Sequence, residues 1–249
     1  MYGHRARIGY AGPLMCQEVI PYEFYQMVPK GVTMMMVSLD LVDMTEEEVN
    51  DSAERGIRAG KVLARMGADI VVWGGGPILI AEGLTSLEDR IAALEKEFGI
   101  PVTTTMTASA NAMIKLGSKK VVSVPPHPPI PWQKTKPTTE TSADALLERM
   151  AGVQVIGEKS IPAETLIELG GLDSEMSAQT GRELLAEHPE ADTIYFGGPH
   201  RPIADQIDNL ERERGVNVVT SLQAAIWEAL RRAGVSDSID GFGRLFREF

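Results

Sequence analysis

Two glycine-rich segments have the composition of an anion-binding turn. Gly74-Gly75-Gly76-Pro77 follows one apolar run, and Gly197-Gly198-Pro199-His200 follows another. Glycine lets a ligand approach the backbone closely, and a proline near the first helical position leaves the other amides pointing outward. Free amides and the positive end of a helix favour a carboxylate or a phosphate, although such turns can also serve only tight packing. The residues expected to bind substrate here are Gly75, Gly76, Pro77, Gly197, Gly198 and Pro199.

Two of the four histidines also follow predicted strands. His127 lies between prolines in residues 124–129, and His200 ends the second glycine-rich segment. A loop histidine titrates near neutral pH and suits a general acid or base, whereas an exposed or structural imidazole is the alternative. No HxxxH or HxH spacing occurs, so we predict no metal site. The glycine spacing matches neither a dinucleotide fingerprint nor a Walker motif, so no nucleotide cofactor is predicted either.

Cys16 is the only cysteine, and it lies shortly after the first predicted strand. A single cysteine excludes an intramolecular disulfide, as is usual in a reducing compartment. A free cysteine is either a small buried apolar residue or a nucleophile. Its place at a predicted strand end makes Cys16 a candidate nucleophile.

The elements that must position these residues alternate along the whole chain. Short apolar runs are separated by capped helical patterns, such as the one that begins at Thr45 with Glu48 three residues later. This alternation is typical of an α/β protein with parallel sheets, whose ligands bind at the carboxyl ends of the strands. The predicted strands are residues 6–11, 32–38, 70–73, 101–104, 120–124, 153–156, 193–196 and 217–220.

An internal repeat divides this pattern into two parts. Residues 69–75 resemble residues 192–198, residues 99–104 resemble residues 215–220, and a looser match joins the segments that begin near Arg7 and Lys120. The alternative is coincidence, since any two βα units share an apolar strand and a glycine. We predict two pseudo-symmetric four-stranded parallel-sheet α/β halves, with the site in the cleft between them. The halves would comprise residues 1–117, with the chain end packed back onto them, and residues 118–249.

The charge and the amino terminus exclude several classes of partner. The net charge is −11 and the isoelectric point is near 4.9. These values argue against binding to nucleic acid or to an anionic membrane surface. The first ten residues contain no apolar secretory stretch, and the longest apolar region, residues 67–84, is interrupted by Asp69, Glu82 and three consecutive glycines. We expect a cytoplasmic protein with no membrane or nucleic-acid partner.

Several longer motifs resemble a known family. They are Arg7-Ile-Gly-Tyr-Ala-Gly-Pro13, Val28-Pro-Lys-Gly-Val32, Gly99-Ile-Pro-Val102, Val219-Thr-Ser-Leu-Gln-Ala224 and Gly241-Phe-Gly-Arg-Leu245. With them the chain is similar to the aspartate/glutamate racemase superfamily, in particular to its branch of maleate cis-trans isomerases and arylmalonate decarboxylases. The resemblance implies two similar halves with the site between them, a small carboxylate substrate, a homo-oligomer, and neither an organic cofactor nor a metal.

The residues that this family uses for chemistry differ here. Family members use one or two cysteines, and those positions correspond to about Gly75 and Gly198 in this sequence. In the first conserved loop, maleate isomerases carry an asparagine that contacts a substrate carboxylate, and alignment on Pro13 places Cys16 there. Pro13 of the same loop is among the residues expected to bind substrate. The protein therefore lacks the cysteines that transfer a proton in racemisation and isomerisation by the family's usual route.

Three functions remain open at this point. The first is a cofactor-independent lyase that decarboxylates a small malonate-like acid, with backbone donors for the developing enediolate and His127 or His200 as the acid. The second is a cis-trans isomerase or racemase that works by an altered mechanism, for instance with Cys16 as a relocated nucleophile. The third is a catalytically silent protein that binds a carboxylate.

Overall fold

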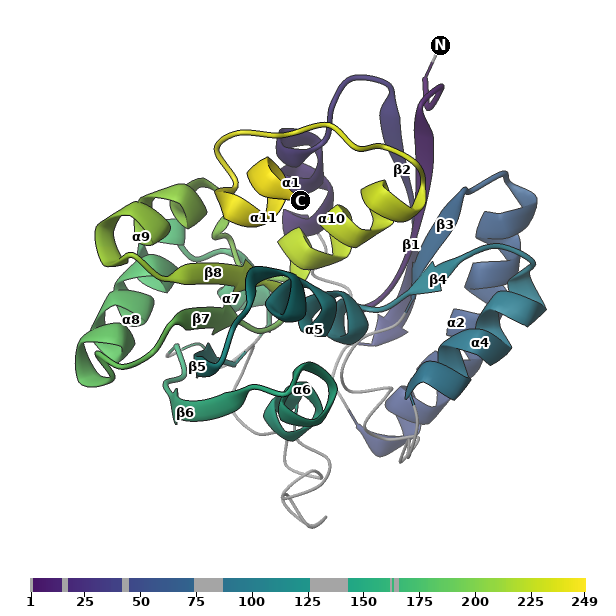
Figure 1. Cartoon of the computed structure of the whole chain (residues 1–249). Coiled ribbons are helices and arrows are strands. Elements are labelled where there is room, and N and C mark those ends of the chain that lie inside the picture. Colours follow the sequence, from purple (N-terminus) through teal and green to yellow (C-terminus); the bar gives the residue numbers. More distant parts are fainter. Residues whose placement is uncertain are drawn as a thin grey trace.

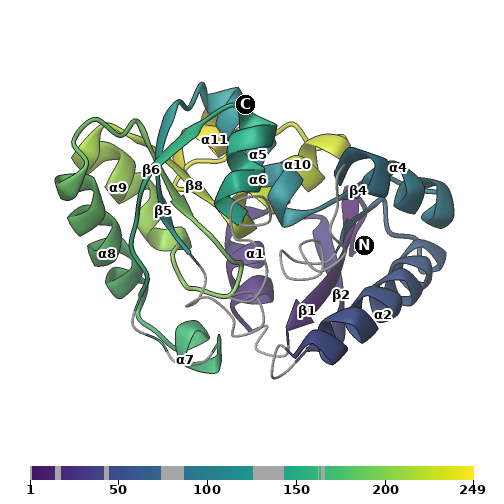
Figure 2. The same ribbon diagram turned by 90° about the horizontal axis from the view of Figure 1, so that it is seen from below.

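The chain forms two four-stranded parallel sheets with the same strand order. The computed structural model describes residues 2–14, 18–41, 45–73, 87–125, 143–161, 163 and 166–249. The first sheet has the order β2-β1-β3-β4 and the second has the order β6-β5-β7-β8 (Figures 1 and 2). Each strand of the first sheet therefore has a counterpart at the same place in the second, as the internal repeat predicts.

All eight predicted strands are present, and four of them have the predicted bounds. The strands are β1 (Ala6–Leu14), β2 (Val32–Leu41), β3 (Ile70–Trp73), β4 (Val102–Thr103), β5 (Lys120–Val124), β6 (Gln154–Glu158), β7 (Thr193–Phe196) and β8 (Asn217–Thr220). All four residues of β3, β7 and β8 are buried, because helices cover both faces of each sheet. The division of the chain near residue 117 remains a prediction.

The helices form an outer layer on each side and an inner layer between the sheets. In Figure 2, α2 and α4 lie outside the first sheet, α8 and α9 lie outside the second, and α5 and α10 lie between them. No helix in the described part of the chain is long and apolar enough to cross a membrane. The helices are α1 (Val19–Met27), α2 (Glu46–Arg65), α4 (Leu87–Phe98), α5 (Thr105–Leu116), α6 (Ala143–Ala151), α7 (Leu166–Gly170), α8 (Ser174–Glu187), η2 (Ala204–Gln206), α9 (Ile207–Arg214), α10 (Ser221–Arg232) and α11 (Gly243–Glu248).

The two inner helices begin in the same way. Thr104 caps α5 by accepting a hydrogen bond from the Thr107 amide at 3.1 Å, and Thr220 caps α10 by accepting one from the Gln223 amide at 3.1 Å. Both helices have a full capping box, in which the third residue returns a hydrogen bond to the cap. The repeated segments 99–104 and 215–220 thus encode the end of an edge strand and the start of an inner helix.

These inner helices pack against each other and join the two halves. Glu228 of α10 accepts hydrogen bonds from the Thr103 hydroxyl at 2.8 Å and from the Asn111 amide at 2.9 Å. Tyr195 and Val219 of the second sheet belong to the same buried apolar cluster as the strands of the first. The two sheets therefore share one hydrophobic core along α5 and α10.

Glu23 makes a second connection between the halves. This residue of α1 is buried, and its Oε1 accepts hydrogen bonds from the amides of Ile203 at 2.7 Å and Ala204 at 2.9 Å. Its Oε2 has no partner among the described residues. Burial is the main reason that the pKa of Glu23 rises to about 7, and the two amide bonds only partly oppose it.

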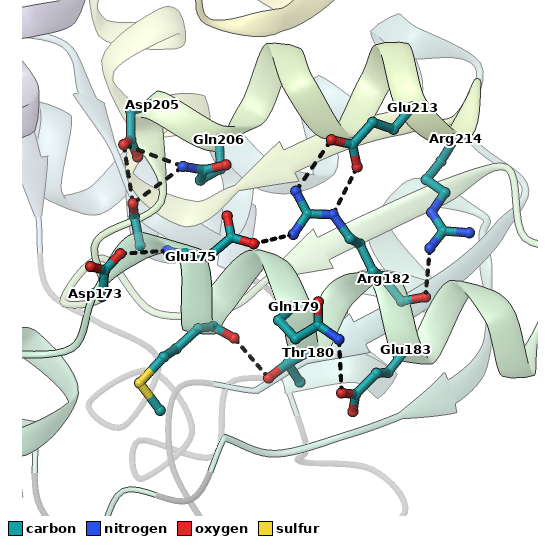
Figure 3. A network of polar contacts seen from close by, with 12 residues as sticks. Asp173, Glu175, Gln179, Thr180, Arg182, Glu183, Asp205, Gln206, Glu213 and Arg214 are labelled. Carbon is teal, nitrogen blue, oxygen red and sulfur yellow. Dashed lines mark hydrogen bonds and ion pairs between the residues drawn. The ribbon is translucent and has the colours of Figure 1, made fainter.

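On the outer surface of the second half, ion pairs join α8 to α9. The Arg182 guanidinium donates to Glu175 at 2.6 Å and to Glu213 at 2.7 Å, and Asp173 caps α8 by accepting from the Glu175 amide (Figure 3). Every carboxylate in this network is largely exposed, so the ion pairs add little to stability.

Replacing Thr104 by alanine should destabilise the protein by about 1–2 kcal/mol, because the buried Thr107 amide loses its acceptor. Urea unfolding followed by circular dichroism measures this change. Thr180→Ala is the matched control, since Thr180 lies inside α8 and its hydroxyl donates to the Met176 carbonyl of the same helix. We expect the control to change the free energy of unfolding by less than about 0.5 kcal/mol. Equal effects of the two substitutions would contradict the capping role.

Replacing Glu23 by glutamine should stabilise the protein more at about pH 8 than at about pH 5. Between its ordinary pKa of 4.5 and its folded pKa of about 7, Glu23 holds a proton only in the folded state. Its contribution to stability is therefore full below the lower value and lost as the pH rises through the higher one. Glutamine keeps the acceptor oxygen but does not titrate. The difference between variant and wild type, from urea unfolding at both pH values, should grow by at most about 3 kcal/mol; a constant difference would refute the assignment.

Candidate active site

The candidate site lies at the carboxyl ends of three neighbouring strands of the second sheet, β5, β7 and β8. The segment 197–201 follows β7, Pro125 follows β5, and Ser221 follows β8. Gly198 has a φ of +79°, a backbone conformation that favours glycine. In parallel sheets ligands bind outside this edge, so these residues occupy the expected place.

The amides of the second glycine-rich segment are engaged by the protein itself. The Gly197 amide donates to the Val124 carbonyl at 2.9 Å, which extends the pairing of β7 with β5 by one residue. The Gly198 amide donates to the Ser221 hydroxyl at 3.0 Å. These two amides are therefore not open donors in this structure, contrary to the expectation of a free amide cradle. Whether Gly197, Gly198 and Pro199 contact substrate remains a prediction.

A buried hydroxyl cluster lies behind this segment and was not predicted from the sequence. The Tyr195 hydroxyl is 2.7 Å from the Ser221 hydroxyl, and the Ser109 hydroxyl of α5 approaches Tyr195 at 3.5 Å. All three residues are buried. Burial raises the pKa of Tyr195, so the phenol stays protonated and can act as a donor. The cluster connects the first half of the chain to the Gly198 backbone.

The acidic group Asp144 lies on the face of the second sheet that carries Tyr195. Ser123 is the register partner of Tyr195, and its hydroxyl donates to Asp144 at 3.0 Å. Burial and the nearby carboxylates of Glu158 and Glu148 raise the pKa of Asp144 to about 6, against the effect of the Ser123 bond. Asp144 can therefore gain or lose a proton near neutral pH.

Arg201 places a positive charge at this edge. Its side chain is fully buried, its Nη2 donates to the Pro125 carbonyl, and its guanidinium carbon lies 5.9 Å from the centre of the Phe196 ring. Its Nε and Nη1 have no acceptor among the residues that the structure describes. Desolvation lowers the pKa of Arg201 to about 9, and the group remains a cation at neutral pH.

His200, a candidate acid from the sequence, also lies in this segment. Only 2% of its surface is exposed. A Cβ atom added to Gly170 of α7 would lie 3.4 Å from the His200 carbonyl and 3.7 Å from a Glu18 carboxylate oxygen. His200 therefore lies where α7 and the start of α1 meet, and it directly precedes Arg201 in the chain.

The other predicted site residues are not tested by the structure. Pro13 belongs to β1, but its side chain lies outside the described part. Within the described residues, no group of three or more histidine, cysteine, aspartate or glutamate side chains is placed to hold a metal ion. The remaining candidates lie outside the described residues and are Cys16, Gly75, Gly76, Pro77 and His127.

The sequence profile of the arylmalonate decarboxylase family matches residues 13–246 of this chain. An arylmalonate decarboxylase from Bordetella bronchiseptica is 26% identical over 230 residues, which cover 89% of this chain and 86% of that protein. These matches span nearly the whole sequence.

Solved structures show the same fold. A crystal structure of arylmalonate decarboxylase has a TM-score of 0.80 at 23% identity and covers 98% of this chain and 100% of that one. The maleate isomerase Iso from Pseudomonas putida S16 has a TM-score of 0.81 at 18% identity and covers 98% of each chain. The resemblance to this branch of the aspartate/glutamate racemase superfamily is confirmed, and the chain belongs to the arylmalonate decarboxylase family, whose matched relatives are enzymes.

Proposed function

We propose that this protein is a cofactor-independent decarboxylase of a small malonate-like acid. The observation that carries the proposal is the family match over residues 13–246. It is supported by the buried polar groups at one sheet edge, where residues 197–201 include a histidine and a cation and a hydroxyl cluster holds the Gly198 backbone.

The reaction needs three things from the protein. The bond between the α-carbon and one carboxylate breaks, carbon dioxide leaves, and the electron pair moves into the retained carboxylate to form an enediolate. That enediolate needs hydrogen-bond donors or a cation, the leaving carboxylate needs a site that excludes water, and the α-carbon needs a proton. A malonate dianion plus one proton then gives a monocarboxylate and carbon dioxide.

The residues at the sheet edge can be assigned to these tasks. Residues 195–201 and Ser221 are buried or half-buried, so water has little access to this part of the edge. Tyr195 and Ser221 hold the Gly198 backbone through a continuous chain of hydrogen bonds, which keeps the turn rigid. His200 is proposed as the acid that protonates the α-carbon, with His127 as the alternative. No step of this mechanism uses a cysteine.

Proton NMR in heavy water should show decarboxylation when the purified protein is mixed with phenylmalonate or malonate. The proposal predicts phenylacetate or acetate with one deuterium at the α-carbon, because solvent supplies the new proton. Maleate and aspartate belong in the same panel. Fumarate, or loss of the aspartate α-proton signal, without any product from a malonate would instead indicate an isomerase or racemase. Line broadening without product would indicate a silent carboxylate-binding protein.

Replacing His200 by alanine should lower kcat about a hundredfold or more if His200 is the acid. His188→Ala is the matched control, because His188 lies between β6 and the end of α8, away from residues 197–201. We expect this variant to turn over substrate at the wild-type rate. Initial rates from the NMR assay and a thermal unfolding curve for each variant give the comparison. A His200→Ala protein that is folded and fully active would eliminate His200 and leave His127 as the acid.

A further inference from the structure

Arg201 is a buried cation whose charge the described protein does not neutralise. Two other arginines show how the charge can be satisfied: Arg182 binds two carboxylates (Figure 3), and Arg231 donates to the carbonyls of Phe249, Val235 and Asp237 at 2.7–3.0 Å. Arg201 is more buried than either but has one carbonyl, that of Pro125, and no carboxylate among the described groups.

Such an arrangement is costly in the absence of a ligand. A buried charge is destabilising unless an opposite charge and hydrogen bonds compensate for its lost hydration. The Phe196 ring lies 5.9 Å from the guanidinium carbon and provides only a weak attraction. The Nε and Nη1 atoms, which carry three N–H groups, still lack acceptors in the described part of the chain, so the guanidinium can donate to a carboxylate oxygen from either nitrogen.

The guanidinium also lies where a ligand is expected. Its contacts with Pro125 and Phe196 place it between the carboxyl ends of β5 and β7. Hydrogen bonds fix both ends of the segment that carries Arg201. At one end the Gly198 amide donates to the Ser221 hydroxyl, and at the other the amides of Ile203 and Ala204 donate to the Glu23 carboxylate. The position of the charge is therefore built into the fold before any ligand arrives.

We propose that Arg201 binds the carboxylate that the substrate retains during decarboxylation; the assignment deepens the proposed function and rests on it. As the carbon–carbon bond breaks, the electron pair moves into this carboxylate, whose negative charge grows, while the other carboxylate leaves as neutral carbon dioxide. A cation at the retained carboxylate therefore binds the transition state more tightly than the substrate, which accelerates the reaction. A cation at the leaving carboxylate would have the opposite effect.

The test compares Arg201→Met, Arg201→Lys and the surface control Arg182→Met. Binding of phenylacetate and of propionate, which resemble decarboxylation products, is measured by calorimetry, and turnover of phenylmalonate is measured by NMR. We expect Arg201→Met to weaken carboxylate binding at least about thirtyfold, Arg201→Lys to weaken it less, and Arg182→Met to leave it unchanged. Without ligand, Arg201→Met should unfold at the same temperature as wild type or higher, since it removes an uncompensated buried charge.

The outcomes separate this assignment from the proposed function. If Arg201→Met binds carboxylates within threefold of wild type, if wild type binds neither probe, or if neither Arg201 variant folds, the assignment is overturned. If wild type decarboxylates phenylmalonate and Arg201→Met does so equally well, the proposed function stands and the assignment fails. If no malonate is decarboxylated but Arg201→Met still loses carboxylate binding, Arg201 remains a carboxylate-binding residue, whereas the proposed function and the retained-carboxylate role that rests on it both fail.

Discussion

The packing of α5 against α10 is the interaction on which the rest of the structure depends. Each helix begins at a buried threonine cap that ends the last strand of a sheet, so the repeat brings two equivalent helices face to face. Because the helices lie between the sheets, they merge the two halves into a shared apolar core. Ser109 on α5 and Ser221 at the start of α10 both approach the Tyr195 hydroxyl. The same packing that joins the halves thus assembles the polar groups at the edge of the second sheet.

At that edge the protein combines rigidity with an unbalanced charge. The amides of Gly197 and Gly198 are used to hold the turn, and the hydroxyl cluster and Glu23 fix its two ends. What remains for a ligand is the Arg201 guanidinium, which is buried and short of acceptors among the described residues. In the proposed function, this guanidinium selects a small anion through its charge. This role also agrees with a decarboxylation that depends on stabilising an enediolate and not on a cysteine.

Most of the fold could be predicted from the sequence, because it depends on local patterns. Apolar runs and helix caps give every strand, and the repeat gives the matching order of the two sheets. The errors lie at strand ends. β4 is shorter than predicted because Pro101 has no amide to donate and Thr104 serves as a cap, whereas β1 continues past Gly12 because Leu14 still pairs with Leu41 across an irregularity.

The site was less predictable, because its residues meet only in the folded chain. Glycine and histidine patterns pointed to residues 197–200, but an open amide cradle was expected where the amides are already bonded. Ser109 and Tyr195 are 86 residues apart, and no spacing in the sequence links them. Nor does a lone arginine in a polar turn indicate that it will be buried. Tyr195, Ser221 and Arg201 were therefore found from the structure.

A crystal structure with bound phenylacetate would test the central claim most directly, namely that this edge of the second sheet binds a substrate carboxylate. We expect the carboxylate between the ends of β5 and β7, within hydrogen-bond distance of Nε or Nη1 of Arg201, with the hydrogen bond from the Gly198 amide to Ser221 intact. Phenylacetate bound elsewhere, with the Arg201 guanidinium paired to a carboxylate of the chain itself, would contradict it.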